Sequence, residues 1–237
     1  MSSPPLSNTF EGGTDGVIIS GANSGGASGN AFDNTPGNPT FTAAQKMHGG
    51  LAVAITDATA GLGVNWTGFG GITADLWIRY YLWIPAWPTG ANLRTHQYLD
   101  AGGVNHGAFE VQTSGRPRWH TGLAATQGSV DFPVSQWTRV EMRMRADTSV
   151  GQIEVRWYAT PDSTGAPTDT WNATGLNTGA GTASMAFGSM NSFPTTPYTI
   201  YLDDLAVSTT DWIGTSFVPP VVPGPNLWVL RSPYRLN

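Results

Sequence analysis

The chain contains no cysteine among its 237 residues, so neither disulfides nor thiolate metal sites can stabilise it, and the redox compartment stays open. Charged residues are also scarce, at 11% of the sequence against roughly 25% in an average globular protein. The formal net charge is −5, and the sequence shows no basic patch of the kind that neutralises a phosphate backbone. We therefore expect a neutral, hydroxyl-rich surface and no nucleic-acid partner.

Long apolar runs are missing as well. No segment approaches the ~20 consecutive apolar residues of a membrane-spanning helix, and residues 1–5 have neither the basic start nor the apolar stretch of a secretory signal. The sequence therefore predicts no membrane span and no secretion. On that expectation, the two Asn-X-Thr sequons at Asn65 and Asn172 carry no glycan.

Catalytic motifs are not found. The sequence has no Walker A motif, no dinucleotide glycine fingerprint, no His-Glu-X-X-His and no Gly-X-Ser-X-Gly. Glu141 and Glu154 could form the carboxylate pair that glycanases use, but arginines flank both of them, which favours cross-strand ion pairs. The expectation is a protein that is not an enzyme. Its histidines show no metal-ligand spacing, although His96 and His120 lie in strand-like runs beside aromatic residues.

What the sequence does contain is alternation of period two. In residues 137–145 Val140, Met142 and Met144 share one face, and most of the other positions are charged, which is typical of a half-buried antiparallel strand. A turn over 147–151 precedes residues 152–158, where Ile153 and Val155 resume the pattern together with Trp157. The two segments predict a β-hairpin.

A second long strand is predicted over residues 75–84, with one apolar face and one aromatic and cationic face. Shorter strand candidates are residues 51–55, 62–66, 95–100, 109–112, 118–121 and 185–188, separated by Gly, Asn, Asp and Pro. This spacing predicts two antiparallel sheets in an all-β sandwich or jelly roll with less than about a tenth helix. A hydrophobic content of 40% is enough for one substantial core.

The last predicted strand contains an irregularity. Ile200 and Leu202 place the core face at even positions, whereas Leu205 and Val207 place it at odd positions. A slip of one residue within a strand indicates a β-bulge, which is therefore predicted at residues 203–204.

Two terminal segments carry a family resemblance. Residues 8–13 (NTFEGG) and 201–207 (YLDDLAV), with Ser208 and residues 212–214 (WIG), resemble the concanavalin A-like (laminin G-like) jelly rolls of bacterial glycan-binding modules and bacteriophage virion proteins. The resemblance spans about residues 8–214 and implies that the first and last strands meet. The predicted organisation is an N-terminal extension over 1–7, a jelly-roll sandwich over 8–216 and a C-terminal arm over 217–237.

The same resemblance implies a structural Ca²⁺, because many such jelly rolls hold one between an early Glu and a late Asp. The matching residues are Glu11 and either Asp203 or Asp204. Calcium takes about 6 to 8 oxygen ligands, backbone carbonyls included. The alternative is that these carboxylates cap turns at the edge of the sandwich, and the sequence leaves both open.

The candidate ligand surface is the aromatic and cationic face of the 75–84 strand beside the charged face of the 137–145 strand. Sugars stack on flat rings and hydrogen-bond to charged side chains. The predicted ligand-binding residues are Trp77, Arg79, Tyr81, Trp83, Arg139, Glu141 and Arg143. In the alternative, the two tryptophans pack beneath loops and only Arg79 and Tyr81 reach solvent.

The composition changes from about residue 217. Residues 217–225 contain four prolines and favour an extended, polyproline-like segment. Residues 226–237 are apolar, aromatic and basic, and a solvated tail does not normally carry Trp228, Leu230 and Tyr234 together. These three residues are therefore predicted to dock on a partner.

The resemblance implies a non-enzymatic bacteriophage virion protein, either a capsid decoration or a minor tail protein. It would be made in the host cytoplasm, displayed on the virion surface as an oligomer and anchored to other virion proteins by the arm, with a lectin-like jelly roll for host-surface glycans. The alternative is a polysaccharide-active enzyme, a glycanase or lyase, or its carbohydrate-binding module. Residues 139–143 (RVEMR) resemble the Arg-X-Glu-Leu-Arg strand of jelly-roll alginate lyases, but the companion Gln-Ile-His and Tyr-X-Lys-X-Gly motifs are absent.

Overall fold

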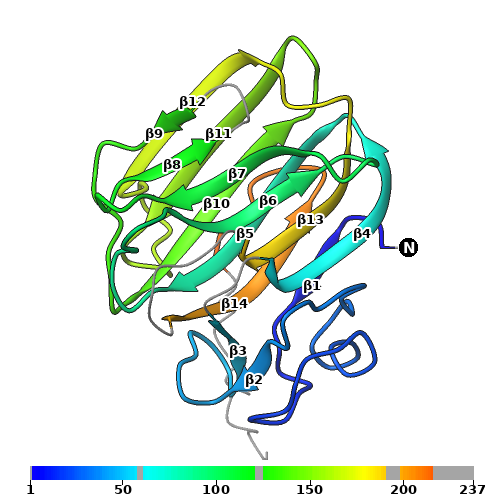
Figure 1. Ribbon diagram of the computed structural model, residues 1–237, viewed down its shortest axis with the longest axis vertical. Coiled ribbons are helices and arrows are strands. Elements are labelled where there is room, and N and C mark those ends of the chain that lie inside the picture. Colours follow the sequence, from blue (N-terminus) through cyan, green and yellow to red (C-terminus); the bar gives the residue numbers. More distant parts are fainter. Residues whose placement is uncertain (1, 58–60, 121–124, 191–197, 216–237) are drawn as a thin grey trace, which may run out of the picture.

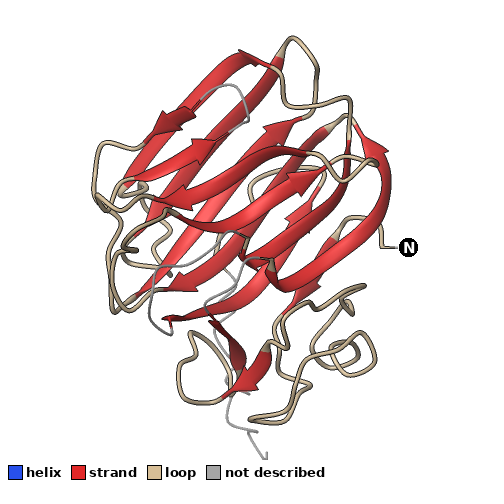
Figure 2. Ribbon diagram, in the orientation of Figure 1, coloured by secondary structure: helices blue, strands red, loops and turns tan. Residues whose placement is uncertain are grey.

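Strands make up the regular structure of this chain. The computed structural model describes residues 2–57, 61–120, 125–190 and 198–215 (Figure 1), and fourteen strands and no helix occur in these ranges. They form two antiparallel sheets packed face to face (Figure 2). The predicted all-β, two-sheet jelly-roll sandwich is therefore confirmed. The predicted arm with Trp228, Leu230 and Tyr234 lies outside the described residues.

The larger sheet has eight strands and the smaller sheet six. In the larger sheet the order is β12 (Asp169–Leu176), β11 (Gly151–Tyr158), β10 (Trp137–Arg145), β5 (Asp75–Trp83), β14 (Tyr198–Ser208), β3 (Ala52–Asp57) and β2 (Thr40–Thr42), and β1 (Leu6–Asn8) also pairs with β14. In the smaller sheet it is β4 (Leu62–Ile72), β13 (Thr182–Ser189), β6 (Leu93–Leu99), β7 (Asn105–Val111), β8 (Pro117–His120) and β9 (Ala125–Gln127). The described residues contain no helix that is long and apolar enough to cross a membrane.

The core lies between the two sheets and follows the alternation of the sequence. The predicted hairpin is confirmed as β10–β11, in which Met142 pairs with Val155. Its inward side chains are all at most 2% exposed: Val140, Met142, Met144, Ile153, Val155 and Trp157. Each large apolar side chain buried in this way contributes roughly 1.5–3 kcal/mol, so the hairpin is a main source of stability.

Aromatic rings from both sheets meet at the centre of the core. Tyr80 of β5 lies 5.8 Å from Phe187 of β13 and 6.4 Å from Phe109 of β7, measured between ring centroids, and both contacts are edge-to-face. His96 of β6 lies 4.6 Å from Phe187 and is fully buried. Such pairs contribute beyond their buried area, and here they join the two layers.

The last strand contains the predicted bulge. The register of β14 against β5 shifts between Asp203 and Ala206, and Asp204 has a positive φ of 46°. Leu202 and Leu205 nevertheless both stay in the core. The strand pairs with β3 before the bulge and with β1 after it.

The first and last strands meet, as the resemblance implied, through the pairing of Leu6 with Val207 and of Asn8 with Leu205, but of the segment 8–13 only Asn8 lies in the strand. Because β1 begins at Leu6, the predicted boundary at residue 8 falls inside the first strand. The edge strand β12 was not predicted, since only Asp169 of its eight residues is buried and its sequence is mostly polar.

Candidate functional site

The outward face of the larger sheet holds all seven residues that were predicted to bind a ligand. Four lie on β5 and three on β10, and the strands are in a register that pairs Trp77 with Arg143, Arg79 with Glu141, and Tyr81 with Arg139. The structure thus brings the predicted set together on one surface.

Most of that surface is covered, however. Arg79, Tyr81, Arg139 and Glu141 are each at most 6% exposed, whereas Trp77 and Trp83 of the set are half-buried. This reverses the alternative reading, in which the tryptophans were covered and Arg79 and Tyr81 reached solvent. A ligand cannot reach four of the seven side chains in this arrangement.

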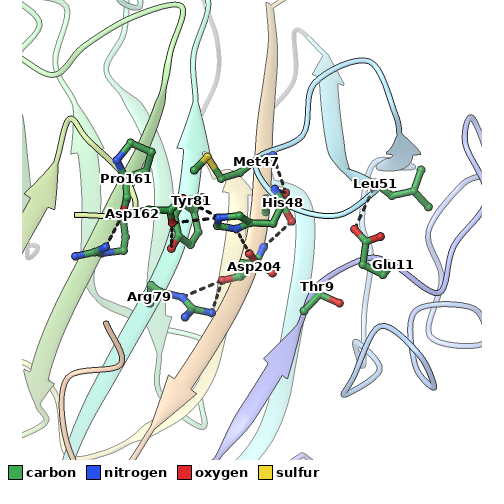
Figure 3. A network of polar contacts seen from close by, with 12 residues as sticks. Thr9, Glu11, Met47, His48, Leu51, Arg79, Tyr81, Pro161, Asp162 and Asp204 are labelled. Atoms are coloured by element: carbon green, nitrogen blue, oxygen red, sulfur yellow. Dashed lines mark hydrogen bonds and ion pairs between the residues drawn. The ribbon is translucent and has the colours of Figure 1, made fainter. Parts of the chain in front are cut away.

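Loops cover the face because the arginines bind their backbone. Arg139 donates to the carbonyl oxygens of Pro161 and Ser163, and its guanidinium lies 3.8 Å from the centre of the Tyr158 ring. Arg79 donates to the carbonyl oxygen of Asp204 from Nη2 at 3.1 Å (Figure 3). It also donates to the carbonyl oxygen of Gly214 from Nη1 at 3.3 Å. The contacts to Pro161 and Ser163 and to Gly214 hold two chain segments over the sheet, and the contact to Asp204 joins β5 to the bulge of β14.

His48, at the centre of Figure 3, joins the bulge of β14 to the segment that carries Asp162. Its Nδ1 lies 2.5 Å from Oδ2 of Asp204 and its Nε2 lies 3.1 Å from Oδ1 of Asp162. Burial alone would lower the pKa of His48, but the two carboxylates raise it to about 9. Burial, and then the charge of Asp204, raise the pKa of Asp203 to about 8. His48 therefore serves as a cationic bridge between a loop and the bulge.

The three carboxylates of the predicted calcium site do not converge. Glu11 accepts hydrogen bonds from the backbone N–H groups of Gly50 and Leu51, at 2.7 and 3.1 Å. Asp203 accepts from those of Met47 and His48 instead, at 2.9 and 3.1 Å. Within the described ranges, no three or more His, Asp or Glu side chains are grouped so that they could hold a metal ion.

The carboxylate contacts fit the capping alternative, since both groups fix the loop between β2 and β3. The calcium site itself stays a prediction.

The outward face of the smaller sheet carries a second polar cluster, centred on Glu110 of β7. Arg94 of β6 donates to Oε1 of Glu110 from Nε at 3.0 Å and from Nη2 at 2.8 Å. Arg118 of β8 donates from Nε to Oε2 at 2.7 Å, and its Nη2 lies 2.6 Å from the same oxygen. The carboxylate is only 2% exposed, but the Arg94 and Arg118 side chains are 21% and 24% exposed. The arginines thus form the accessible rim of a buried ion-pair cluster.

Burial alone would raise the pKa of Glu110, but the hydrogen bonds from Arg118 and Arg94 hold it below its ordinary value. His120 lies beside the cluster, with Nδ1 4.0 Å from Oε1 of Glu110 and a side chain that is 33% exposed. Burial, with the charges of the two arginines, lowers the pKa of His120. At neutral pH the face therefore presents two guanidinium groups and a neutral imidazole.

Arg94, Glu110 and Arg118 form one row across the strands of this sheet. In the next row on the same face, small and polar residues alternate. Ala186 of β13 pairs with Gln97 of β6, which pairs with Ala108 of β7, which in turn pairs with His120 of β8. Both alanines are buried, while Gln97 and His120 are partly exposed. The two alanines form a low floor, and the longer side chains of Gln97 and His120 stand on either side of Ala108.

A shallow hollow of about 510 Å³ continues this face toward β4. It is lined by Thr67 and Ser184, by Asp100 and by a run of glycines after Thr67. Ser184 is two residues from Ala186 along β13, so the hollow adjoins the low row. The smaller sheet therefore offers a broad, partly open surface on which polar side chains border glycines and alanines.

This surface was not predicted from the sequence. His120 beside aromatic residues and the short strands near residues 95–100, 109–112 and 118–121 were predicted. The shared row of Arg94, Glu110 and Arg118 depends on the register of three separate strands, which side-chain period does not give. The alternation of Glu110 with the buried Phe109 and Val111 was the signal that could have found it.

No family model matches the sequence, and no match is found among curated proteins. Solved structures do match. A cellulose-induced protein, Cip1, aligns with a TM-score of 0.55 at 14% identity, over 88% of this chain and 98% of that chain. A botulinum neurotoxin type C structure, described as interacting with two ganglioside molecules, aligns with a TM-score of 0.53 at 10% identity, over 86% of this chain and 47% of that chain.

Trypanosoma rangeli sialidase with the inhibitor DANA aligns with a TM-score of 0.50 at 10% identity, over 88% of this chain and 31% of that chain. This chain thus spans less than half of the toxin chain and about a third of the sialidase chain. At such identities the likeness shows the fold alone, a sheet-rich jelly-roll sandwich.

Proposed function

We propose that this jelly roll is a non-enzymatic glycan-binding module that works through the outward face of the smaller sheet. The observation that carries the proposal is the pair of cross-strand rows on β6, β7 and β8. They present guanidinium, amide and imidazole groups beside a low alanine floor. Sugars need closely spaced donors and acceptors of this kind, on a surface wide enough for several rings.

Two of the structural neighbours support the proposal in their descriptions. One is named for its induction by cellulose and another is described as interacting with gangliosides. These words concern those proteins, and they suggest a ligand class for the shared fold.

The larger sheet is the less favourable face, because loops cover its central arginines. Trp77 and Trp83 are still half-buried rather than fully buried, so they remain candidates for a stacking contact at its margin. Arg143 donates to Asp75 at 2.9 Å and is also partly exposed. The predicted ligand role of these residues is therefore kept as the competing location.

Affinity electrophoresis tests the proposal. The protein is run through gels that contain neutral or acidic polysaccharides, and at least one should retard it. His120→Ala should reduce the retardation, while the matched variant Trp77→Ala on the other face should leave it unchanged. If no polysaccharide retards the protein, glycan binding is refuted, and if only Trp77→Ala matters, the ligand lies on the larger sheet.

The setting we propose for this module is the surface of a bacteriophage particle. Its supports are the resemblance of the terminal strands and the composition of residues 217–237, which suit an anchoring arm. Mass spectrometry of purified virions would test it, since a structural component is present in a fixed number of copies per particle. Absence from the particle would leave a free glycan-binding module.

A polysaccharide-active enzyme is the second candidate. The observation in its favour is His120, whose lowered pKa leaves a neutral imidazole able to accept a proton beside two arginines. Against it, Glu110 is held ionised by those arginines and Glu141 is buried, so neither is placed as a general acid at the surface. We expect no release of reducing ends or unsaturated sugars from a polysaccharide panel. Release that is lost in His120→Ala or Glu141→Gln would establish the enzyme instead.

A further inference from the structure

The charge of the Glu110 cluster differs in sign from that of the whole protein. Arg94 and Arg118 bring two positive charges against the single negative charge of Glu110, so the three side chains together carry one net positive charge. The protein as a whole has a formal net charge of −5. The exposed rim of the smaller sheet is thus locally cationic on an acidic molecule.

The cluster also keeps donors for a ligand. A guanidinium has five N–H donors, and Arg118 directs Nε and Nη2 at Glu110. Its Nη1 makes no hydrogen bond with any residue of the described ranges, and the side chain is 24% exposed. Because Glu110 takes only the Nε and Nη2 side of the guanidinium, the outer, Nη1 edge of Arg118 stays available to a ligand, while the negative charge of Glu110 partly offsets the attraction for an anion.

From this geometry we propose that the smaller sheet selects acidic glycans, with the carboxylate or sulfate of a sugar bound at the outer edge of Arg118, beside His120. The inference rests on the proposed glycan-binding function and names the chemical class of its ligand. Arginine binds such oxygen anions through charge-assisted hydrogen bonds that are roughly twice as strong as neutral ones. The neutral Gln97 and the low alanine floor lie next to this point and leave room for the rest of the sugar ring.

The two partners of one ion pair provide the test. Arg118→Gln and Glu110→Gln both break the Arg118–Glu110 contact, but the first removes a positive charge and the second removes a negative one. If the ion pair only stabilises the sheet, both variants should bind the acidic polymer more weakly. If Arg118 binds the anion, Arg118→Gln should bind it more weakly and Glu110→Gln should not.

The probes are polygalacturonate for the carboxylate, dextran sulfate for the sulfate and unmodified dextran as the neutral polymer. We expect the wild-type protein to bind at least one acidic polymer more tightly than dextran, and less tightly as salt is added. Arg118→Gln should weaken that binding by about tenfold or more, as the loss of one charge-assisted hydrogen bond does. Glu110→Gln should bind at least as tightly as wild type.

Arg145→Gln is the matched control, since it removes the same charge from β10 of the other sheet, where Arg145 pairs with Asp75. It should change the affinity by less than about twofold, the size of a weak surface interaction. If Arg118→Gln does not fold, Arg118→Lys is the second variant. It keeps the positive charge but loses the planar, paired N–H donors of the guanidinium, so weaker binding of the acidic polymer is again expected.

Equal binding of dextran and the acidic polymers would overturn this inference and leave the glycan-binding function intact. Equal weakening in Arg118→Gln and Glu110→Gln would overturn it as well. Binding of no polymer at all, including the wider polysaccharide panel, would refute the function on which it rests.

Discussion

At the scale of residues, Glu110 and Glu141 show how the neighbours of a carboxylate decide its charge. Both are 2% exposed and lie on outward faces of the two sheets. Burial raises the pKa of Glu141, and the nearby arginines, Arg139 first, only partly offset it. Glu110 accepts hydrogen bonds from arginines at both oxygens, and its pKa is lowered. The arginines around Glu110 keep its buried carboxylate ionised, and the carboxylate in turn holds the partly exposed Arg94 and Arg118 in place.

His96 gives a pH prediction at the same scale. Burial lowers its pKa to about 3, so the folded protein keeps the ring neutral, while the unfolded chain binds a proton below about pH 6.5. Stability is therefore lost as the pH falls below that value, by about 2 kcal/mol between pH 7 and pH 5 from this group alone. Phenylalanine cannot take up a proton, so His96→Phe should remove this part of the pH dependence.

Urea unfolding of the wild-type protein and of His96→Phe at both pH values provides the measurement. The difference in unfolding free energy between the two proteins should move in favour of the variant at pH 5. A difference that is the same at both pH values would show that His96 is protonated in the folded state or exposed to solvent.

At the scale of elements, β14 contains the predicted bulge and pairs with the first strand, β1. Its bulge at Asp204 allows the strand to pair with β3 on one side of the irregularity and with β1 on the other. The carbonyl oxygen of the same residue accepts hydrogen bonds from Arg79, and its carboxylate contacts His48. A change at the bulge should therefore affect the sheet and its covering loops together.

The calcium prediction belongs to this element. Cation binding to the folded state alone would raise the unfolding temperature with concentration. We expect added Ca²⁺ to raise it and EDTA to lower it, and Glu11→Gln or Asp204→Asn to abolish the response. An unfolding temperature that neither calcium nor EDTA changes would show that the carboxylates only cap the loop between β2 and β3.

Elements with strong alternation could be predicted from the sequence, but the register between the short strands of the smaller sheet could not, and neither could the segments that cover a face. The inward residues of β5, β10 and β11 and the bulge in β14 all followed from side-chain period. That period says which residues share a face, but it does not say whether a loop covers the face. Arg79 and Arg139 therefore looked like surface residues, although their guanidinium groups bind the backbone of segments outside the strands, at Gly214 and at Pro161 and Ser163. The row through Glu110 was hidden for the same reason.

At the scale of the whole molecule, the sandwich has two unlike outward faces. The larger sheet is covered at its centre by loops that its own arginines hold, and the smaller sheet presents a cationic, partly exposed rim. A module that is anchored on one side and binds a ligand on the other needs such a difference. The glycan and particle proposals are compatible with each other on these grounds.

The arm prediction is made for the whole protein. Deleting residues 217–237 should leave the jelly roll folded and its unfolding temperature nearly unchanged, because the core residues of the described ranges pack on one another between the two sheets. The deletion should abolish incorporation into particles or oligomers, since aromatic anchors at an interface typically cost about 2 kcal/mol or more each when removed. Assembly of the truncated protein at full occupancy would assign the contact to the sandwich itself.

Binding of the glycan to the smaller sheet can be observed in solution. It is tested most directly by an NMR titration of the protein with short oligosaccharides cut from the polysaccharide that retards it most in affinity electrophoresis. The changes in amide and arginine side-chain chemical shifts should be largest on β6, β7 and β8, around Arg94, Glu110 and Arg118. Changes that gather on β5 and β10, around Trp77 and Arg143, would contradict it and return the binding site to the larger sheet.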